Sequence, residues 1–190
     1  MAARAEFIDF PVEGATLGAL RWAGLSGAPT VVAVHGITSN AWVWDPLAHH
    51  LAGAAELVAV DLRGRGRSFD AAPPYGIGQH AADIASIVDQ LGGPLVLLGH
   101  SMGAFVVELV AERHPRLVRD LLLVDGGAPL AAPTDGDVDA FRIERATKGG
   151  PVVTAGIDPS QRDIDEEPLD EQVAEDLAAT LRRVSGLPTG

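Results

Sequence analysis

Residues 99–103 read GHSMG, and this pentapeptide is the most informative motif of the chain. It follows the apolar run at 94–98 (PLVLL) and precedes the helix-like stretch at 104–110 (AFVVELV). A strand, a Gly-x-Ser-x-Gly turn and a helix in this order form the arrangement called a nucleophile elbow. The turn is tight, so Gly99 and Gly103 are needed where a side chain would collide with the neighbouring strand or helix.

Two further segments have the character of buried strands that end in special loops. Residues 30–36 (TVVAVHG) form an apolar run ending in His-Gly, and residues 57–68 (LVAVDLRGRGRS) run into a loop rich in glycine and arginine. Together with the pentapeptide, these segments resemble the α/β-hydrolase superfamily, in its esterase/lipase-like branch. The resemblance covers about residues 6–127 and implies a mostly parallel sheet with flanking helices and a serine hydrolase mechanism.

Hydrophobic patterning predicts six strands and four helices. The strands are expected at residues 6–10, 17–22, 30–34, 57–61, 95–98 and 121–124. The helices are expected at residues 42–52, 80–91, 102–113 and 168–184. The family usually has eight strands, and Val152-Val153 is too short to count as one. We therefore expect the chain to be truncated before strands seven and eight.

The composition changes at residue 126, and this predicts two regions. Residues 1–126 are expected to form the N-terminal part of the hydrolase core. Residues 127–190 are acidic and rich in glycine and proline at their start, which is typical of a partial helical cap or a linker. The helix at about 168–184 carries a single apolar stripe and is followed by Gly186, a usual helix end.

Ser101 is the candidate nucleophile, because an elbow raises its hydroxyl above the sheet. An oxyanion hole requires two backbone N–H groups, one of them on the residue after the nucleophile, which is Met102. The resemblance places the second donor in the loop that follows the strand at 30–34, where Ile37 matches the family position best.

The sequence offers one candidate for the catalytic acid and none for the general base. Asp125 follows the strand at 121–124 and is the candidate acid, although an aspartate at a strand end equally serves to hold a turn. In this fold the chain order is serine, acid and then histidine. All six histidines precede the candidate acid, so we expect the catalytic histidine not to be present in this chain. They are His35, His49, His50, His80, His100 and His114.

None of these histidines is predicted to replace the missing base. The resemblance implies that His35 shapes the oxyanion loop, and His100 lies inside the elbow, where neighbouring side chains point away from the serine. His49 and His50 are expected at the surface. His80 and His114 are expected at helix boundaries.

Charge and composition exclude several classes of function. The net charge of −12 argues against nucleic-acid binding, and the only local basic cluster, at residues 63–67, is interpreted as structural. The chain has no cysteine, and no cofactor or metal is implied. The N-terminus does not read as a signal peptide and no run is long enough to span a membrane, so a cytoplasmic location is expected.

These observations predict a serine hydrolase that acts on a small-molecule acyl substrate: a carboxylic ester, thioester, lactone or small amide. Relatives of this fold that are haloalkane dehalogenases or epoxide hydrolases use aspartate where this chain has Ser101. The alternative is a catalytically inactive, truncated hydrolase that serves as a binding or regulatory module. Continuation of the reading frame beyond Gly190, with a histidine, would discriminate between the two.

The strand at 121–124 (LLLV) is expected to become a sheet edge if strands seven and eight are absent. It is apolar throughout and contains no lysine or proline, so it would be an open template for another strand. It would then be covered by a missing part of the protein, by self-association or by residues 127–190, with the helix at 168–184 as the best candidate.

Overall fold

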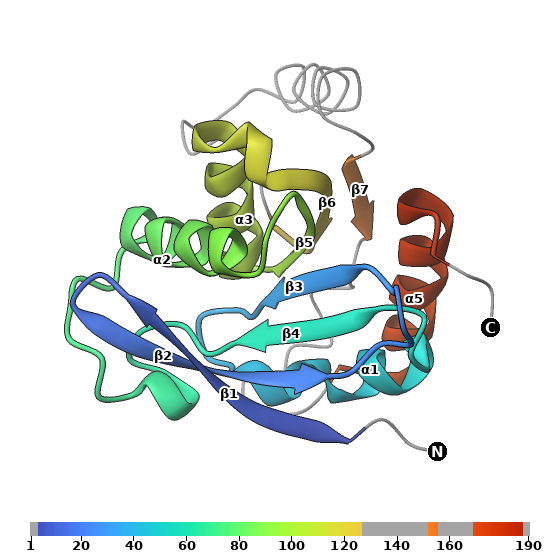
Figure 1. The fold of residues 1–190 in the computed structure, drawn as a ribbon, viewed down its shortest axis with the longest axis horizontal. Helices are drawn as coiled ribbons and strands as arrows, with labels where there is room; N and C mark the ends of the chain where they lie inside the picture. The colour runs from blue at the N-terminus through green and yellow to red at the C-terminus, as the bar shows by residue number, and fades with distance from the viewer. Residues whose placement is uncertain (1–3, 127–151, 156–168, 188–190) are drawn as a thin grey trace.

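The computed structural model describes residues 4–126, 152–155 and 169–187, and within them the chain forms one twisted sheet with helices on both faces (Figure 1). The strand order is β1-β2-β4-β3-β5-β6-β7. β1 and β2 form an antiparallel hairpin and β2 is antiparallel to β4, whereas all other neighbouring strands are parallel. The strands are β1 (Ala5–Val12), β2 (Ala15–Trp22), β3 (Thr30–Val34), β4 (Glu56–Val60), β5 (Leu95–His100), β6 (Val118–Val124) and β7 (Val152–Ala155).

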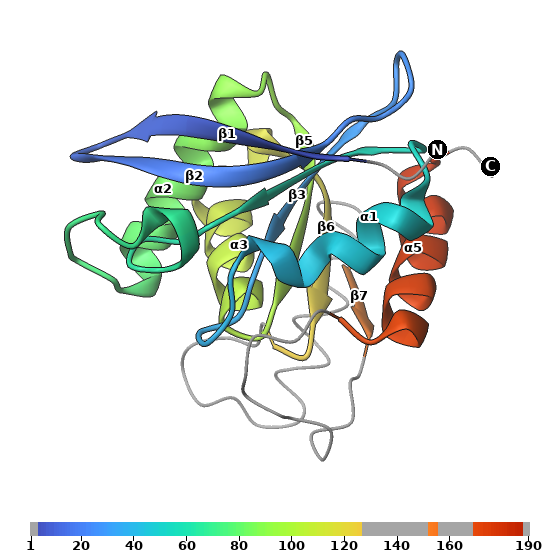
Figure 2. The ribbon, with the colours of Figure 1, turned by 90° about the horizontal axis from the view of Figure 1, so that it is seen from below.

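Helices connect the parallel strands and cover the sheet. The α-helices are α1 (Asp45–Leu51), α2 (Ile77–Gln90), α3 (Met102–Arg113) and α5 (Glu171–Ser185). Three short 3-10 helices are η1 (Ala41–Trp44), η2 (Gly66–Ser68) and η3 (Pro115–Leu117). Figures 1 and 2 show α2 and α3 on one face of the sheet and α1 and α5 on the other.

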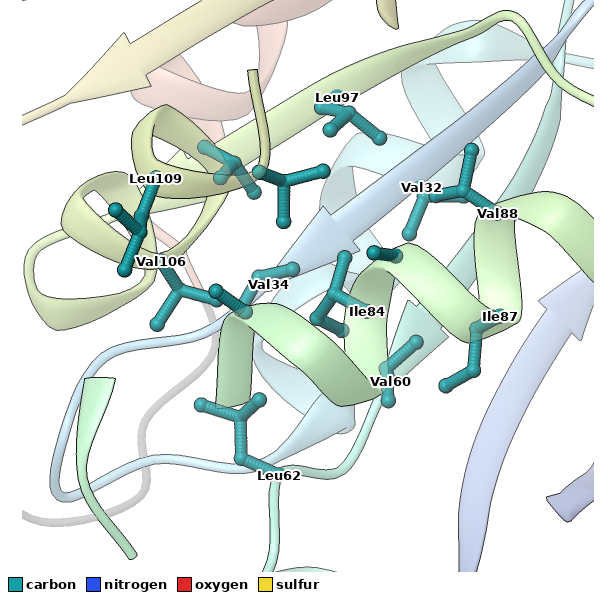
Figure 3. Close-up of a cluster of buried hydrophobic side chains, with 14 of the residues drawn as sticks. Val32, Val34, Val60, Leu62, Ile84, Ile87, Val88, Leu97, Val106 and Leu109 are labelled. Carbon is teal, nitrogen blue, oxygen red and sulfur yellow. The ribbon is translucent and has the colours of Figure 1, made fainter. Parts of the chain in front are cut away.

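The alternation of side chains along each central strand divides the core into two layers. Val32 and Val34 of β3 pack in a cluster with α2 and α3, which Figure 3 shows around Ile84 and Val106. Val31 and Ala33 point to the opposite face and pack with α1 and α5. Both faces of β3 are therefore buried, which explains why residues 30–34 read as a nearly continuous apolar run rather than an alternating one.

The fold class predicted from the sequence is confirmed. All six predicted strands are present, most of them with boundaries that differ by a few residues. The four predicted helices are also present, although residues 42–52 divide into η1 and α1. α2 begins at Ile77 rather than at residue 80, so His80 lies within the helix and not at its boundary as expected. The division at residue 126 stays a prediction, and much of the region expected to form a cap lies outside the described residues.

The expectation that the chain lacks a seventh strand is wrong. β7 pairs in parallel with β6, with Leu121 opposite Val152 and Val124 opposite Ala155. Val152-Val153 is too short to predict a strand on its own, but pairing with an existing strand supplies hydrogen bonds that no isolated segment has. The strand at 121–124 is consequently not an open edge, and the proposed reason for self-association through it disappears. Residues from the region after 126 do cover the edge, but through β7 rather than through the predicted helix.

α5 lies beside α1 and covers the part of the same sheet face that is near β6 (Figure 2). Asp170 caps its start, where one carboxylate oxygen accepts from the N–H groups of Gln172 and Val173 at 2.9 and 3.3 Å. Gly186 ends it in the left-handed conformation that glycine adopts without strain (φ 63°). Leu177 and Leu181 are completely buried in the second core cluster, so the predicted apolar stripe faces the core. In the part of the chain that the structure describes, no helix is long and apolar enough to cross a membrane.

Candidate active site

Ser101 occupies the sharp turn between β5 and α3. Its backbone has φ 51° and ψ −117°, a conformation that is uncommon for residues with a side chain. The surrounding backbone holds the turn: the N–H of Ser101 donates to the carbonyl of Val124 at 2.9 Å, and its carbonyl accepts from Ala104 at 3.0 Å. Strained positions of this kind persist only where neighbouring structure fixes them, and they are concentrated at functional sites.

Glycines make the turn sterically possible, as the sequence predicted. A Cβ on Gly99 would lie 2.3 Å from the carbonyl oxygen of Gly103 in α3, and a Cβ on Gly103 would lie 2.2 Å from the carbonyl oxygen of Val34 in β3. Gly126, which the sequence analysis did not single out, would place a Cβ 2.4 Å from the carbonyl oxygen of Ser101. Strand, turn and helix can approach this closely only because all three positions lack a side chain.

The structure brings the predicted oxyanion donors to the same end of the sheet as Ser101. Met102 is the first residue of α3, and the first N–H groups of a helix have no partner within it. The loop after β3 runs beside the serine, because a Cβ on Gly36 would lie only 3.3 Å from the Cβ of Ser101. Ile37 follows directly in this loop. Two backbone segments therefore flank Ser101, as an oxyanion hole requires.

His35 fixes the start of this loop. The completely buried imidazole accepts from the N–H of Leu62 through Nε2 at 3.1 Å, and its Nδ1 lies 2.7 Å from the carbonyl oxygen of Gly36. The neutral tautomer with a proton on Nδ1 satisfies both contacts. Burial lowers the pKa of His35 to about 4. Since both ring nitrogens are engaged, His35 acts as a structural bridge between two loops and is not available as a general base.

The pKa of His35 predicts how stability depends on pH. Between pH 6.5, its ordinary value, and pH 4 the unfolded chain binds a proton that the native chain does not. Stability must therefore fall as the pH is lowered through this range, by about 2–3 kcal/mol from this group. We expect urea unfolding at pH 7 and at about pH 4.5 to show a larger loss for the wild-type protein than for a His35→Gln variant. Equal losses in the two proteins would contradict the assignment.

Asp61, at the end of β4, ties the same loop to the arginine-rich loop. One carboxylate oxygen accepts from the N–H of Ala41 at 2.6 Å and the other from the N–H of Arg67 at 2.9 Å. Burial raises the pKa of Asp61. Gly66 is required beside it, because a Cβ there would lie 2.3 Å from the Asp61 carboxylate. Asp61 was not a predicted site residue, although an acid at a strand end followed by a glycine-rich loop was a usable signal.

The three arginines of this loop each have a local partner, which agrees with their interpretation as structural. Arg63 forms a buried ion pair with Asp83 at 2.6 Å. Arg65 donates from Nε to the carbonyl oxygen of Ile37 at 2.6 Å and from Nη1 to the carbonyl oxygen of Arg63 at 3.1 Å. Arg67 pairs with Asp9 at 3.1 Å. Arg65 is thus a direct link from this loop to the predicted oxyanion donor.

Asp125 lies beside the elbow, directly after β6. Its backbone is in the left-handed region (φ 47°), between Val124, whose carbonyl holds the N–H of Ser101, and Gly126, which packs against Ser101. The structure therefore places the backbone of the predicted acid close to the backbone of the predicted nucleophile. Its role as the catalytic acid stays a prediction.

Four of the other histidines belong to α1 or α2 or directly follow α3. His49 and His50 are at the surface of α1, where His50 contacts Glu171 at 2.9 Å. His80 is completely buried in α2, and burial lowers its pKa. His114 is exposed after α3. Across residues 4–126, 152–155 and 169–187, no group of three or more histidine and acidic side chains could hold a metal ion.

Comparison with known proteins gives a consistent family assignment. A model of the alpha/beta hydrolase family matches residues 31–189. Lipase LipV of Mycobacterium tuberculosis is 34% identical over 170 residues, covering 82% of this chain and 60% of the lipase. N-formylmaleamate deformylase of Pseudomonas putida is 39% identical over 117 residues, covering 60% of this chain and 42% of that enzyme.

Solved structures agree with this assignment. The thioesterase domain of the curacin biosynthetic pathway superimposes with a TM-score of 0.60 at 27% identity, over 76% of this chain and 50% of that domain. The chain spans 60% or less of the length of the curated relatives just named. Because the family model covers most of the chain, the chain belongs to the alpha/beta hydrolase family.

Proposed function

We propose that the protein is a serine hydrolase that cleaves a carboxylic ester, thioester, lactone or small amide through an acyl-enzyme at Ser101. The observation that carries this proposal is the backbone of Ser101, held at φ 51° between β5 and α3 with the Gly36 loop against its Cβ. We expect this geometry to present the Ser101 hydroxyl beside the backbone N–H groups of Met102 and Ile37. The names of the relatives, a lipase, a deformylase and a thioesterase, also support acyl transfer chemistry.

In the proposed reaction, the Ser101 hydroxyl oxygen attacks the substrate carbonyl and its proton passes to a general base. The N–H groups of Met102 and Ile37 stabilise the negative oxygen of the tetrahedral intermediate. Collapse expels the alcohol, thiol or amine, which takes the proton from the base. Water then attacks the acyl-enzyme and releases the carboxylic acid, which regenerates the serine.

The base in this proposal is a histidine outside residues 1–190, with Asp125 as the candidate acid that orients it. His35 is committed to Leu62 and Gly36, which removes it as a substitute. The same observation favours the second candidate function, a binding module without turnover. Hydrolysis of p-nitrophenyl acetate by the complete protein separates the two candidate functions. A hydrolase would accelerate this reaction, whereas a binding module would not.

A fluorophosphonate probe tests the proposal directly. It reacts with an activated serine by forming a Ser Oγ–P bond and releasing fluoride, so the complete protein should gain one adduct mass. Peptide mapping should locate the adduct on Ser101 in the tryptic peptide that contains the elbow. Labelling of a different residue, or no labelling of a folded complete protein that binds acyl substrates, would overturn the assignment.

Arg65 should act as a positioning residue for the oxyanion loop, because it holds the carbonyl of Ile37. Arg65→Met keeps most of the side-chain length but removes the donors. We expect kcat for an aryl ester to fall about tenfold with KM nearly unchanged, since a displaced N–H group mainly weakens transition-state binding. Arg67→Met, which breaks an exposed pair in the same loop, is the matched control. Equal kcat values for the two variants would contradict this role.

A further inference from the structure

A groove of about 650 Å³ lies between α2 and the segment that follows α3. Its lining comes from two separated stretches of chain: Ala82, Ala85, Ser86 and Asp89 of α2, and residues 113–117 at the end of α3 and in η3. This volume is within the range of about 300–1,000 Å³ that is usual for small-molecule sites.

The groove is remote from the proposed active site. Ser101 precedes the first residue of α3, whereas Arg113 is its last residue. A helix rises about 1.5 Å per residue, so the two ends of α3 are about 17 Å apart. No residue that lines the groove belongs to the elbow, the oxyanion loop or the arginine-rich loop.

The wall formed by the end of α3 and η3 carries two guanidinium groups that form no ion pair within the described residues. Arg113 and Arg116 are exposed, and neither forms a salt bridge with another residue that the structure describes, in contrast to Arg21, Arg63 and Arg67. His114 lies between them in sequence and also lines the groove. Asp89 is the only carboxylate among the lining residues, so the charge there opposes the net charge of −12 of the whole chain.

Arg113 ends α3 and also reaches toward α2. A cation in the last turn of a helix interacts favourably with the helix dipole, and this accounts for its charge. Its guanidinium, however, extends across to α2, where Nη1 lies 3.8 Å from the Cβ position of Gly78. Arg116 lies beyond the helix in η3, where no such dipole argument applies.

The remaining lining is apolar except for Ser86. Ala82 and Ala85 on α2 face Pro115 and Leu117, and the small alanine side chains are what leave the space unfilled. An apolar hollow with guanidinium groups at one wall matches a ligand that has an anionic group on a short aliphatic chain. Arginine binds carboxylates with two parallel hydrogen bonds, which makes it well suited to this task.

We propose that this groove binds a small aliphatic carboxylate, with Arg113 and Arg116 contacting the carboxylate and the aliphatic chain lying against Ala82, Ala85 and Leu117. The site goes beyond the proposed hydrolase function and does not depend on it. Its ligand is defined by one negative charge and a chain of several methylene groups.

Titration of the complete protein with sodium octanoate, followed by NMR of the alanine and leucine methyl groups, tests the proposal. We expect saturable shifts at Ala82, Ala85 and Leu117. Acetate, which lacks the chain, and octylamine, which reverses the charge, should each bind at least about tenfold more weakly. The shifts at Ala82, Ala85 and Leu117 should persist when Ser101 carries the fluorophosphonate adduct, which fills the proposed active site, so that binding in the groove is distinguished from binding there.

Three variants complete the test. Arg116→Gln combined with Arg113→Gln should weaken octanoate binding about tenfold or more through loss of charge-assisted hydrogen bonds. Ala82→Leu should fill the groove and weaken binding similarly at little cost to α2, because leucine is also a good helix former. Arg183→Gln removes an exposed arginine of α5 and is the matched control that should leave binding unchanged. Circular dichroism checks that each variant is folded. Unchanged affinity in the folded double variant, or methyl shifts confined to residues around Ser101, would overturn the proposal.

Discussion

Replacing Ser101 by alanine should reduce turnover of an acyl substrate by about a thousandfold or more and abolish fluorophosphonate labelling. The substitution removes the only atom that forms the acyl-enzyme bond in the proposed mechanism. It leaves the Met102 and Ile37 N–H groups in position, so substrate binding should persist and KM should change little. The measurement is steady-state hydrolysis of a p-nitrophenyl ester by the complete protein, together with intact mass after labelling.

Ser26→Ala is the control for this experiment, since Ser26 is exposed in the loop before β3, away from the elbow. It should keep wild-type turnover and labelling. The positive φ of Ser101 is as unfavourable for alanine as it is for serine. The Ser101→Ala and Ser26→Ala variants should therefore unfold at similar denaturant concentrations. Turnover by Ser101→Ala at the rate of Ser26→Ala would refute the assignment of the nucleophile.

Replacing Asp83 by alanine should destabilise the protein by about 3–5 kcal/mol. Asp83 and Arg63 are almost completely buried, and the pair is bidentate, with Nε to Oδ2 at 2.6 Å and Nη2 to Oδ1 at 2.9 Å. Gln79 donates to the same carboxylate at 3.0 Å. Removing Asp83 leaves a buried guanidinium without its counter-charge, and burial of an unpaired charge is far more costly than loss of an exposed pair.

Arg63 also joins distant segments, which adds to this effect. It donates to the carbonyl oxygens of Glu13, in the β1–β2 turn, and of Ala72, at 2.5 and 3.1 Å. Urea unfolding measures the loss, with Asp9→Ala as the matched control. Asp9 pairs with Arg67 at the surface, where an ion pair contributes about 0–1 kcal/mol. A loss for Asp83→Ala no larger than for Asp9→Ala would show that the buried pair is not a main support of this loop.

The elbow was predictable because its determinants are local. A strand of apolar residues, glycines at positions 99 and 103 and a following helix are all adjacent in sequence, and steric exclusion around a tight turn needs no distant partner to be recognised. The same is true of α5, whose cap at Asp170 and whose end at Gly186 lie next to its apolar stripe. The central strands were predictable because burial on both faces leaves a continuous apolar run.

β7 and the supports of the oxyanion loop were not predictable in this way. β7 has four residues, and its hydrogen bonds come from β6, a strand more than twenty-five residues earlier in the chain. Asp61, Arg65 and His35 act across the gap between two loops, so their roles depend on which loops the sheet order places side by side. β3 and β4 are neighbours in the sheet, and this brings the loop after each strand to the same edge.

The hydrolase fold, the elbow around Ser101 and the burial of each central strand were predictable from the amino-acid sequence, because they depend on residues that are close along the chain. In contrast, the pairing of β7 with the edge of β6 and the bridge that His35 forms between Leu62 and Gly36 could be seen only in the folded structure. The same is true of the hydrogen bond from Arg65 to the carbonyl oxygen of Ile37. Each of these depends on backbone groups of a segment distant in sequence, and a backbone carbonyl or N–H carries no signature in the amino-acid sequence that would identify its partner.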